Sequence, residues 1–195
     1  MLDVLTIAGC SSPTSSSTAL LHYVRQKLIQ QNLRVGEIEV RHLPADDLLL
    51  GMKYSPALRQ GCDLVRQAAA VVIATPIRNR SLSGGLKAFL DILPQDALVD
   101  KLVLPIATSS VAINLAHVDA AMRLILSSLG ARQIFDVVQV LDHQVQLYDR
   151  QVHLDPFARQ SLDESVRNLV DDLSSKPSTV HRLVGDSFPE FLAFN

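Results

Sequence analysis

The sequence lacks the features that mark several specialised protein classes. Its 195 residues carry a formal net charge of -2 and no run of basic residues, which argues against a nucleic-acid-binding protein because neutralising phosphates needs clustered Lys and Arg. No apolar stretch reaches the roughly 18 residues of a membrane-spanning helix. The first residues, MLDVLTIAG, have no basic leader and are typical of a strand rather than a signal peptide. We therefore expect a cytoplasmic protein without nucleic-acid or membrane partners.

Catalytic and metal-binding motifs are also missing. The two cysteines, Cys10 and Cys62, have neither metal nor redox spacing, and we expect two free thiols. No Ser/His/Asp spacing, HExxH motif or catalytic carboxylate pair stands out, and neither GxGxxG nor the P-loop pattern is present. We expect Asp46-Asp47 and Asp171-Asp172 to be surface charges. His117, His143 and His153 stand alone, and we expect structural or solvated roles for them. The sequence predicts no catalytic side chain and no metal site.

The composition and the apolar pattern that remain are those of a globular α/β domain. Hydrophobic residues make up 48% and charged residues 19% of the chain. Short apolar runs alternate with segments of helical periodicity. We expect strands over residues 2–8, 35–43, 70–74, 102–107 and 134–141, and helices over residues 19–30, 56–69, 85–93, 119–129 and 153–174. This alternation predicts a three-layer, doubly wound, five-stranded parallel sheet of the flavodoxin-like form.

The end of the chain differs from the rest. We expect one flavodoxin-like domain over residues 1–174 and a C-terminal tail over residues 175–195, beginning with a linker at 176–178. The tail ends in SFPEFLAFN and holds three of the six phenylalanines of the chain. Exposed apolar residues are a liability, so the tail either folds back over a groove of its own domain or contacts another subunit or protein. The sequence leaves both alternatives open.

Three polar loops interrupt the apolar pattern where strands end, at residues 9–18, 76–85 and 108–116. Ligands of open α/β sheets bind outside the carboxyl ends of the strands, so these loops predict a site. The hydroxyl-rich first loop, with the free N–H groups of the following helix, is typical of a phosphate site; alternatively, its serines only cap the helix.

The second loop, ATPIRNRSLSGGLKAFLD, carries two arginines before a Gly-Gly pair. We expect Ser83 to be the N-cap of the next helix, and the glycines allow the backbone to approach a ligand closely. Lys87 and Asp91 lie four residues apart, which predicts a local ion pair.

Several segments carry a likeness to a known family: IAG before the serine-rich loop, LLHYVRQKL, DDLLLG followed by SPALR, ATP followed by SGGLKAFLDILPQDAL, KLVLPIAT, and VDAAMRLILSSLGA. With them the chain resembles the NADPH-dependent FMN reductases, most closely those that serve alkanesulfonate monooxygenases in sulfur starvation. The resemblance implies a homo-oligomer that binds FMN and transfers hydride from NADPH or NADH to flavin N5. Such chemistry belongs to the cofactor, which accounts for the missing catalytic side chains.

The resemblance also implies a set of cofactor-binding residues. The FMN phosphate would lie on the first loop, and the isoalloxazine edge would meet the second and third loops. The expected residues are Ser11, Ser15, Ser17, Thr18, Pro76, Ile77, Arg78, Asn79, Ser83, Gly84, Thr108, Ser109 and Ser110. Among them, Ser15, Ser17 and Thr18 are expected to hold the phosphate.

The chain departs from the family pattern inside these loops. Ser12 and Ser16 stand where the family carries arginines, Arg78 stands where it favours an aromatic residue, and Ser109-Ser110 replaces Gly-Gly. Ala120 replaces a tyrosine associated with the oligomer interface. Two hypotheses follow. The protein is a flavin reductase in which Arg78 or Arg80 contacts flavin or the nicotinamide nucleotide phosphate, or it keeps the scaffold as a binding or assembly protein without tight flavin binding.

Overall fold

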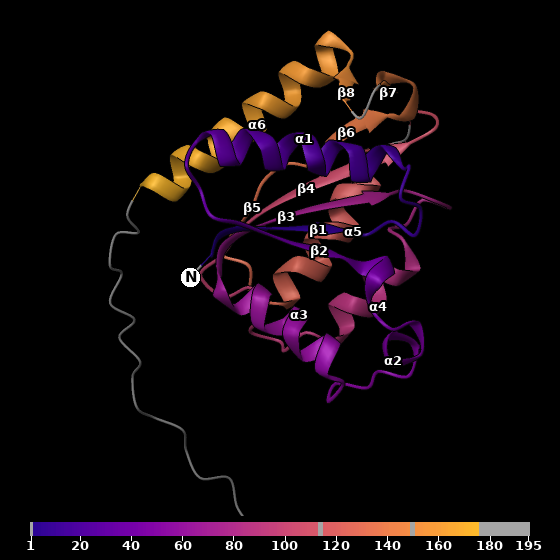
Figure 1. Ribbon diagram of the computed structural model, residues 1–195, viewed down its shortest axis with the longest axis vertical. Helices are drawn as coiled ribbons and strands as arrows, with labels where there is room; N and C mark the ends of the chain where they lie inside the picture. Colours follow the sequence, from indigo (N-terminus) through magenta and orange to yellow (C-terminus); the bar gives the residue numbers. More distant parts are fainter. Residues whose placement is uncertain (1, 113–114, 149–150, 176–195) are drawn as a thin grey trace, which may run out of the picture.

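The computed structural model describes residues 2–112, 115–148 and 151–175, and its central feature is a parallel sheet between two layers of helices (Figure 1). The strands are β1 (Leu2–Ala8), β2 (Val35–Glu39), β3 (Ala68–Pro76), β4 (Leu102–Ser109), β5 (Gln133–Ile134), β6 (Val138–Leu141), β7 (Val145–Tyr148) and β8 (Gln151–Leu154). The helices are α1 (Ser16–Gln30), α2 (Ala45–Leu49), α3 (Pro56–Gln67), α4 (Gly84–Ile92), α5 (Leu115–Ser128) and α6 (Pro156–Ser174), with 3-10 turns η1 (Val40–His42) and η2 (Asp142–Gln144).

The strand order confirms the predicted fold class. The sheet runs β2-β1-β3-β4, and β5 and β6 both pair with β4, so five positions are filled and every pairing is parallel. This is the flavodoxin-like order. The chain adds β2 on one side of β1 and β3 on the other, and a crevice forms at the carboxyl ends of β1 and β3.

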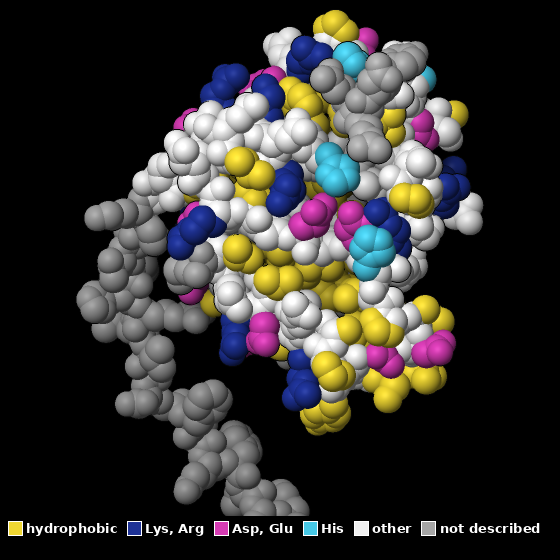
Figure 2. Space-filling model, viewed as in Figure 1, with side chains coloured by type: hydrophobic (Ala, Val, Ile, Leu, Met, Phe, Trp, Pro, Cys, Tyr) yellow, Lys and Arg dark blue, Asp and Glu magenta, His cyan; other side chains and the backbone are white. Residues whose placement is uncertain are grey.

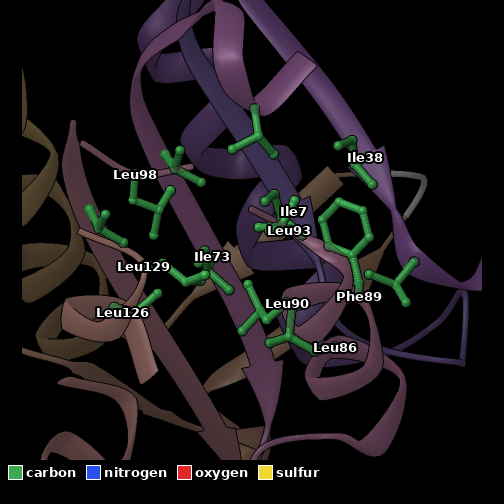
Figure 3. Packing of buried hydrophobic residues seen from close by; sticks show 14 of the residues in the cluster. Ile7, Ile38, Ile73, Leu86, Phe89, Leu90, Leu93, Leu98, Leu126 and Leu129 are labelled. Carbon is green, nitrogen blue, oxygen red and sulfur yellow. The ribbon is translucent and has the colours of Figure 1, made fainter. Parts of the chain in front are cut away.

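The sheet separates two hydrophobic cores. Val4 and Val72 pack with α1 and α6 on one face, and Leu5 and Ile73 pack with α3, α4 and α5 on the other. Figure 3 shows Phe89 of α4 in the second core, pointing toward β1 and β2. Because both faces are covered, the central strands are continuous apolar runs, which is why the sequence pattern found them.

The first helix begins earlier than predicted. α1 starts at Ser16 rather than Ala19, because the side chain of Ser15 accepts a hydrogen bond from the backbone N–H of Thr18 and caps the first turn. The hydroxyl residues that were predicted as loop therefore form part of the helix. Similarly, α5 begins at Leu115 rather than Asp119.

The last strand of the sheet is interrupted where one strand was predicted. Residues 135–137 stand between β5 and β6, opposite only Leu104 and Pro105 of β4. Phe135 donates its N–H to the carbonyl of Val103 at 2.9 Å, so the backbone of Val103 faces this edge. Pro105, two residues further, faces the same way but has no N–H to donate. The proline thus lies where the ladder is broken, as expected for proline within a sheet.

The segment after β6 forms a hairpin that was not predicted. β7 and β8 pair antiparallel apart from the main sheet. The final helix accordingly begins at Pro156 rather than residue 153, because Asp155 accepts a hydrogen bond from the N–H of Phe157 and proline suits the first helical turn.

Two further expectations concern the whole chain. Cys10 and Cys62 are free thiols, as predicted. Within the described ranges, none of the helices combines the length and the hydropathy needed to cross a membrane. Residues 176–195 of the predicted tail lie outside the described residues.

Candidate functional site

The carboxyl edge of the sheet holds a cavity of about 980 Å³, at the place that the strand order predicts. Its walls are the loop after β1, the segment from η1 to α2, and the loop after β3. A second cavity of about 700 Å³ lies between the loop after β3 and the loop after β4. Arg78 and Asn79 line both cavities, so the loop between β3 and α4 forms their common wall.

The structure brings nearly all the predicted site residues to these cavities. The larger cavity is lined by Ser11, Ser15, Pro76, Arg78, Asn79, Ser83, Gly84 and Thr108, and the smaller by Ile77, Arg78, Asn79, Ser109 and Ser110. Ser17 and Thr18 line neither cavity and are almost completely buried.

The buried pair belongs to a hydroxyl network around the start of α1. The Oγ of Ser15 lies 3.1 Å from the Oγ of Ser17 and 2.9 Å from the Oγ1 of Thr18, and it accepts from the N–H of Thr18 at 3.2 Å. These groups satisfy one another and cap the helix. Within the first loop and the start of α1, the hydroxyl residues that line the larger cavity are Ser11, Ser12, Thr14, Ser15 and Ser16.

The sequence analysis missed Arg41, which reaches the first loop from the other side. Arg41 lies in η1, directly after β2, and lines the larger cavity. Its Nη1 is 3.4 Å from the carbonyl oxygen of Ser12 and 3.5 Å from the Oγ1 of Thr18. Its Nη2 forms an ion pair with Glu39, and the two side chains are only 15% and 12% exposed. An arginine in the predicted strand over residues 35–43 gives no sign of such a role, because only the tertiary fold brings it to the loop.

The second loop has a tight turn at its tip. Arg78 and Ser81 exchange both backbone hydrogen bonds at 3.0 Å, and the two residues between them, Asn79 and Arg80, have φ values of 51° and 61°. Positive φ at both central residues is the signature of a type I′ turn, for which Asn-Gly is the preferred pair. Arg80 therefore occupies a position that favours glycine.

Ser83 joins the second loop to the first. It is the N-cap of α4, as predicted, and its Oγ accepts from the N–H of Leu86 at 3.2 Å. The same hydroxyl donates to the carbonyl oxygen of Gly9. One turn further along, Lys87 and Asp91 form the predicted ion pair at 2.5 Å.

The two serines of the third loop differ in burial and in hydrogen bonding. Ser109 is buried, and its Oγ donates to the carbonyl of Val111 at 2.8 Å and accepts from the Nε2 of Gln139 at 3.1 Å. Ser110 is exposed, and His117 lines the same smaller cavity. Residues 113–114 of this loop lie outside the described residues.

Next to the larger cavity, His22, Glu37 and Glu39 bring possible ligand atoms within 4.8 Å of one another. Arginines already compensate both carboxylates: Arg25 lies 3.9 Å from Glu37, and Arg41 pairs with Glu39. Figure 2 shows acidic, basic and histidine side chains side by side near the middle of this face. The arrangement is an ion-pair cluster, and we assign no metal to it.

Comparison with known proteins identifies the family. A family model described as NADPH-dependent FMN reductase matches residues 2–146. The chain belongs to this family. It is 36% identical over 165 residues to an FMN reductase (NADPH) of Escherichia coli (strain K12), with 85% of this chain and 86% of the relative covered. Another FMN reductase (NADPH), of Pseudomonas putida, is 39% identical over 142 residues, covering 73% of this chain and 72% of the relative.

Solved structures agree with this assignment. An NADH:FMN oxidoreductase in its apo form superposes with a TM-score of 0.78 and 29% identity, covering 92% of this chain and 94% of its own. An archaeal flavodoxin shares the fold, with a TM-score of 0.55 and 10% identity. The family pattern and the flavodoxin-like fold therefore extend over the same residues as the two cavities.

Proposed function

We propose that the protein is an NAD(P)H-dependent FMN reductase, which transfers hydride from a nicotinamide to flavin N5 and supplies reduced flavin to an acceptor. The observation that carries the proposal is the cavity at the carboxyl edge of the sheet. A hydroxyl-rich loop and a helix N-terminus form one end of it, and Pro76 and Thr108 contribute to its other walls. Hydroxyls and helix N–H groups suit a phosphate, and apolar lining residues such as Leu48 and Leu82 suit a ring system.

The structure weakens the alternative of a scaffold without tight flavin binding. That hypothesis rested on the lost arginines of the first loop, on Arg78 in place of an aromatic residue, and on the bulk of Ser109-Ser110. The guanidinium of Arg41, from the segment after β2, contacts the first loop in place of the lost arginines. The hydroxyl of Ser109 is held by Val111 and Gln139. The first loop and Ser109 are thus compatible with a bound flavin, and the flavin titration tests Arg78 and Ser110.

FMN, when bound, supplies the redox chemistry by accepting hydride at its flavin ring. In this proposal, the chain contributes binding and orientation. The first loop and the N-terminus of α1 bind the phosphate. The planar guanidinium of Arg78 stacks on the flavin ring or binds an anionic group beside it. Arg80, which lines the smaller cavity, contacts the phosphate of the nicotinamide nucleotide.

The test is direct. Purified protein is titrated with FMN while flavin fluorescence is followed, and NADPH or NADH oxidation is measured with and without FMN. We expect saturable binding and flavin-dependent oxidation. If no binding occurs at roughly tens of micromolar and no turnover is detected, the reductase proposal is wrong and the alternative of a binding or assembly protein stands.

We further propose a cytoplasmic homo-oligomer related most closely to the reductases of alkanesulfonate systems. The segment DDLLLG is part of the likeness that supports this relationship, whereas Ala120 departs from it. Light scattering coupled to size exclusion measures the oligomer. Deletion of residues 187–195 separates the alternatives for the tail: a changed oligomer size or a lost partner indicates docking elsewhere, and lower stability alone indicates contact with its own domain.

A further inference from the structure

We propose that Arg41 binds the phosphate group of the flavin and thereby makes the site prefer FMN to riboflavin, which lacks that group. The inference rests on the proposed function, since it concerns the same cavity. It assigns the positive charge that binds the phosphate to Arg41, which lies outside the first loop and directly after the neighbouring strand β2.

The charge distribution of the larger cavity points to this residue. The loop and helix start over residues 9–18, GCSSPTSSST, contain no ionisable group except the thiol of Cys10. Among the described residues that line the cavity, the cationic side chains are Arg41 and Arg78. Arg78 belongs to the turn on the wall shared with the smaller cavity. Arg41 is the cation that touches the first loop, through Ser12 and Thr18.

The guanidinium of Arg41 is already held in place. Its Nη2 pairs with Glu39, and its Nε lies 3.4 Å from the Nε2 of His42. The side chain is only 15% exposed, so little rotamer freedom remains to be lost when an anion binds. A guanidinium carries five N–H donors in a fixed fork, and Nη1 makes only long contacts to the first loop, to the Ser12 carbonyl and the Thr18 hydroxyl, which an anion can replace.

The position also complements the helix N-terminus. The first N–H groups of α1 have no intrahelical acceptor, and the helix dipole adds a partial positive charge. Nη1 of Arg41 lies close to Thr18 in the first turn of α1. A phosphate at this place would contact helix N–H groups, serine hydroxyls and one guanidinium together. Charge-assisted hydrogen bonds of this kind are about twice as strong as neutral ones.

The experiment compares FMN with riboflavin in wild-type protein, Arg41→Gln and Arg41→Lys, with Arg167→Gln as control. Arg167 is exposed on α6, so its substitution removes the same charge away from the cavity. Binding is followed by flavin fluorescence at low and high salt. We expect Arg41→Gln to weaken FMN binding about tenfold or more and riboflavin binding less than about twofold, with Arg41→Lys intermediate for FMN. Arg167→Gln should bind both flavins like wild type.

Two results would overturn the inference: an equal loss of affinity for both flavins, or no loss for FMN. Far-UV circular dichroism and urea unfolding check that the variants are folded. If Arg41→Gln does not fold, Arg41→Lys decides, because it must lower the FMN-to-riboflavin preference while retaining the positive charge.

A separate arm covers the case in which wild-type protein binds neither flavin, which would refute the proposed function. Inorganic phosphate is then compared with chloride at equal ionic strength. Arg41 as an anion site predicts that phosphate raises the melting temperature of wild type and Arg167→Gln but not of Arg41→Gln. Equal protection of all three proteins, or protection of none, would reject the assignment.

Discussion

At the scale of single residues, Asp3 and Arg34 show how one ion pair ties the start of β1 to the entry of β2. The Nε and Nη2 of Arg34 donate to the two carboxylate oxygens at 3.0 and 2.8 Å, and its backbone N–H donates at 2.8 Å. These hydrogen bonds lower the pKa of Asp3 from its ordinary value of 3.8 to about 2.

This shift predicts a pH-dependent stability. Because the pKa is lower in the folded state, the pair stabilises the protein above the unfolded pKa of 3.8, and this stabilisation is lost as the pH falls through about 2. Arg34 is mostly exposed and screened by solvent, so the contribution is small. Urea unfolding of wild type and Asp3→Asn should give free energies that differ near pH 7 and converge as the pH falls from about 4 to about 2. A difference that is independent of pH would contradict the assignment.

Arg80 carries backbone strain in the turn that forms the wall between the cavities. With a φ of 61°, it adopts the left-handed conformation, which costs a residue with a Cβ about 1 kcal/mol relative to glycine. We expect Arg80→Gly to raise the free energy of unfolding by up to about 1 kcal/mol and to raise the KM for NADPH. Asn79→Gly is the control, since asparagine tolerates this conformation and the stability gain should be smaller. An unchanged KM would argue against a nucleotide contact.

At the scale of elements, the contact between Ser83 and Gly9 joins α4 to the loop after β1. Ser83→Ala removes a helix cap and leaves the carbonyl of Gly9 without this donor. We expect a loss of about 1–2 kcal/mol in unfolding free energy, together with weaker FMN binding because two walls of the larger cavity are no longer tied.

The matched control for this prediction is Ser127→Ala on α5. The Ser127 hydroxyl bonds only to carbonyls of its own helix and is exposed, so its loss should change the stability by less than about 0.5 kcal/mol. Equal effects of the two substitutions in urea unfolding would show that Ser83 acts only as an ordinary surface serine.

The same scale explains which elements were predictable from the sequence. β1, β3 and β4 are buried on both faces, so their apolar runs stand out. The break between β5 and β6 depends on pairing with Pro105, which a local pattern does not contain. The hairpin of β7 and β8 was missed although both strands alternate, because short strands give a weak signal beside a long helix.

At the scale of the whole molecule, the site follows from topology more than from motif. The loops after β1, β3 and β4 were located because parallel strands place their carboxyl ends together, and the cavities lie there. The roles of individual residues were harder to predict from the sequence. Arg41 approaches the first loop only because β2 lies beside β1. Conversely, the predicted Ser17 and Thr18 are turned inward by the Ser15 network.

The direction of the strands has a practical consequence for tethering the protein. β1 begins at Leu2 and α6 ends at Ser174 on the same side of the molecule, whereas the loops around the cavities lie at the other end of the strands (Figure 1). A surface or an electrode attached near either residue would lie on the side opposite the proposed flavin site. An enzyme that consumes reduced flavin would instead be best linked near α2, beside the cavity mouth. The fold thus places the points suited to attachment on one side of the molecule and the candidate site on the other.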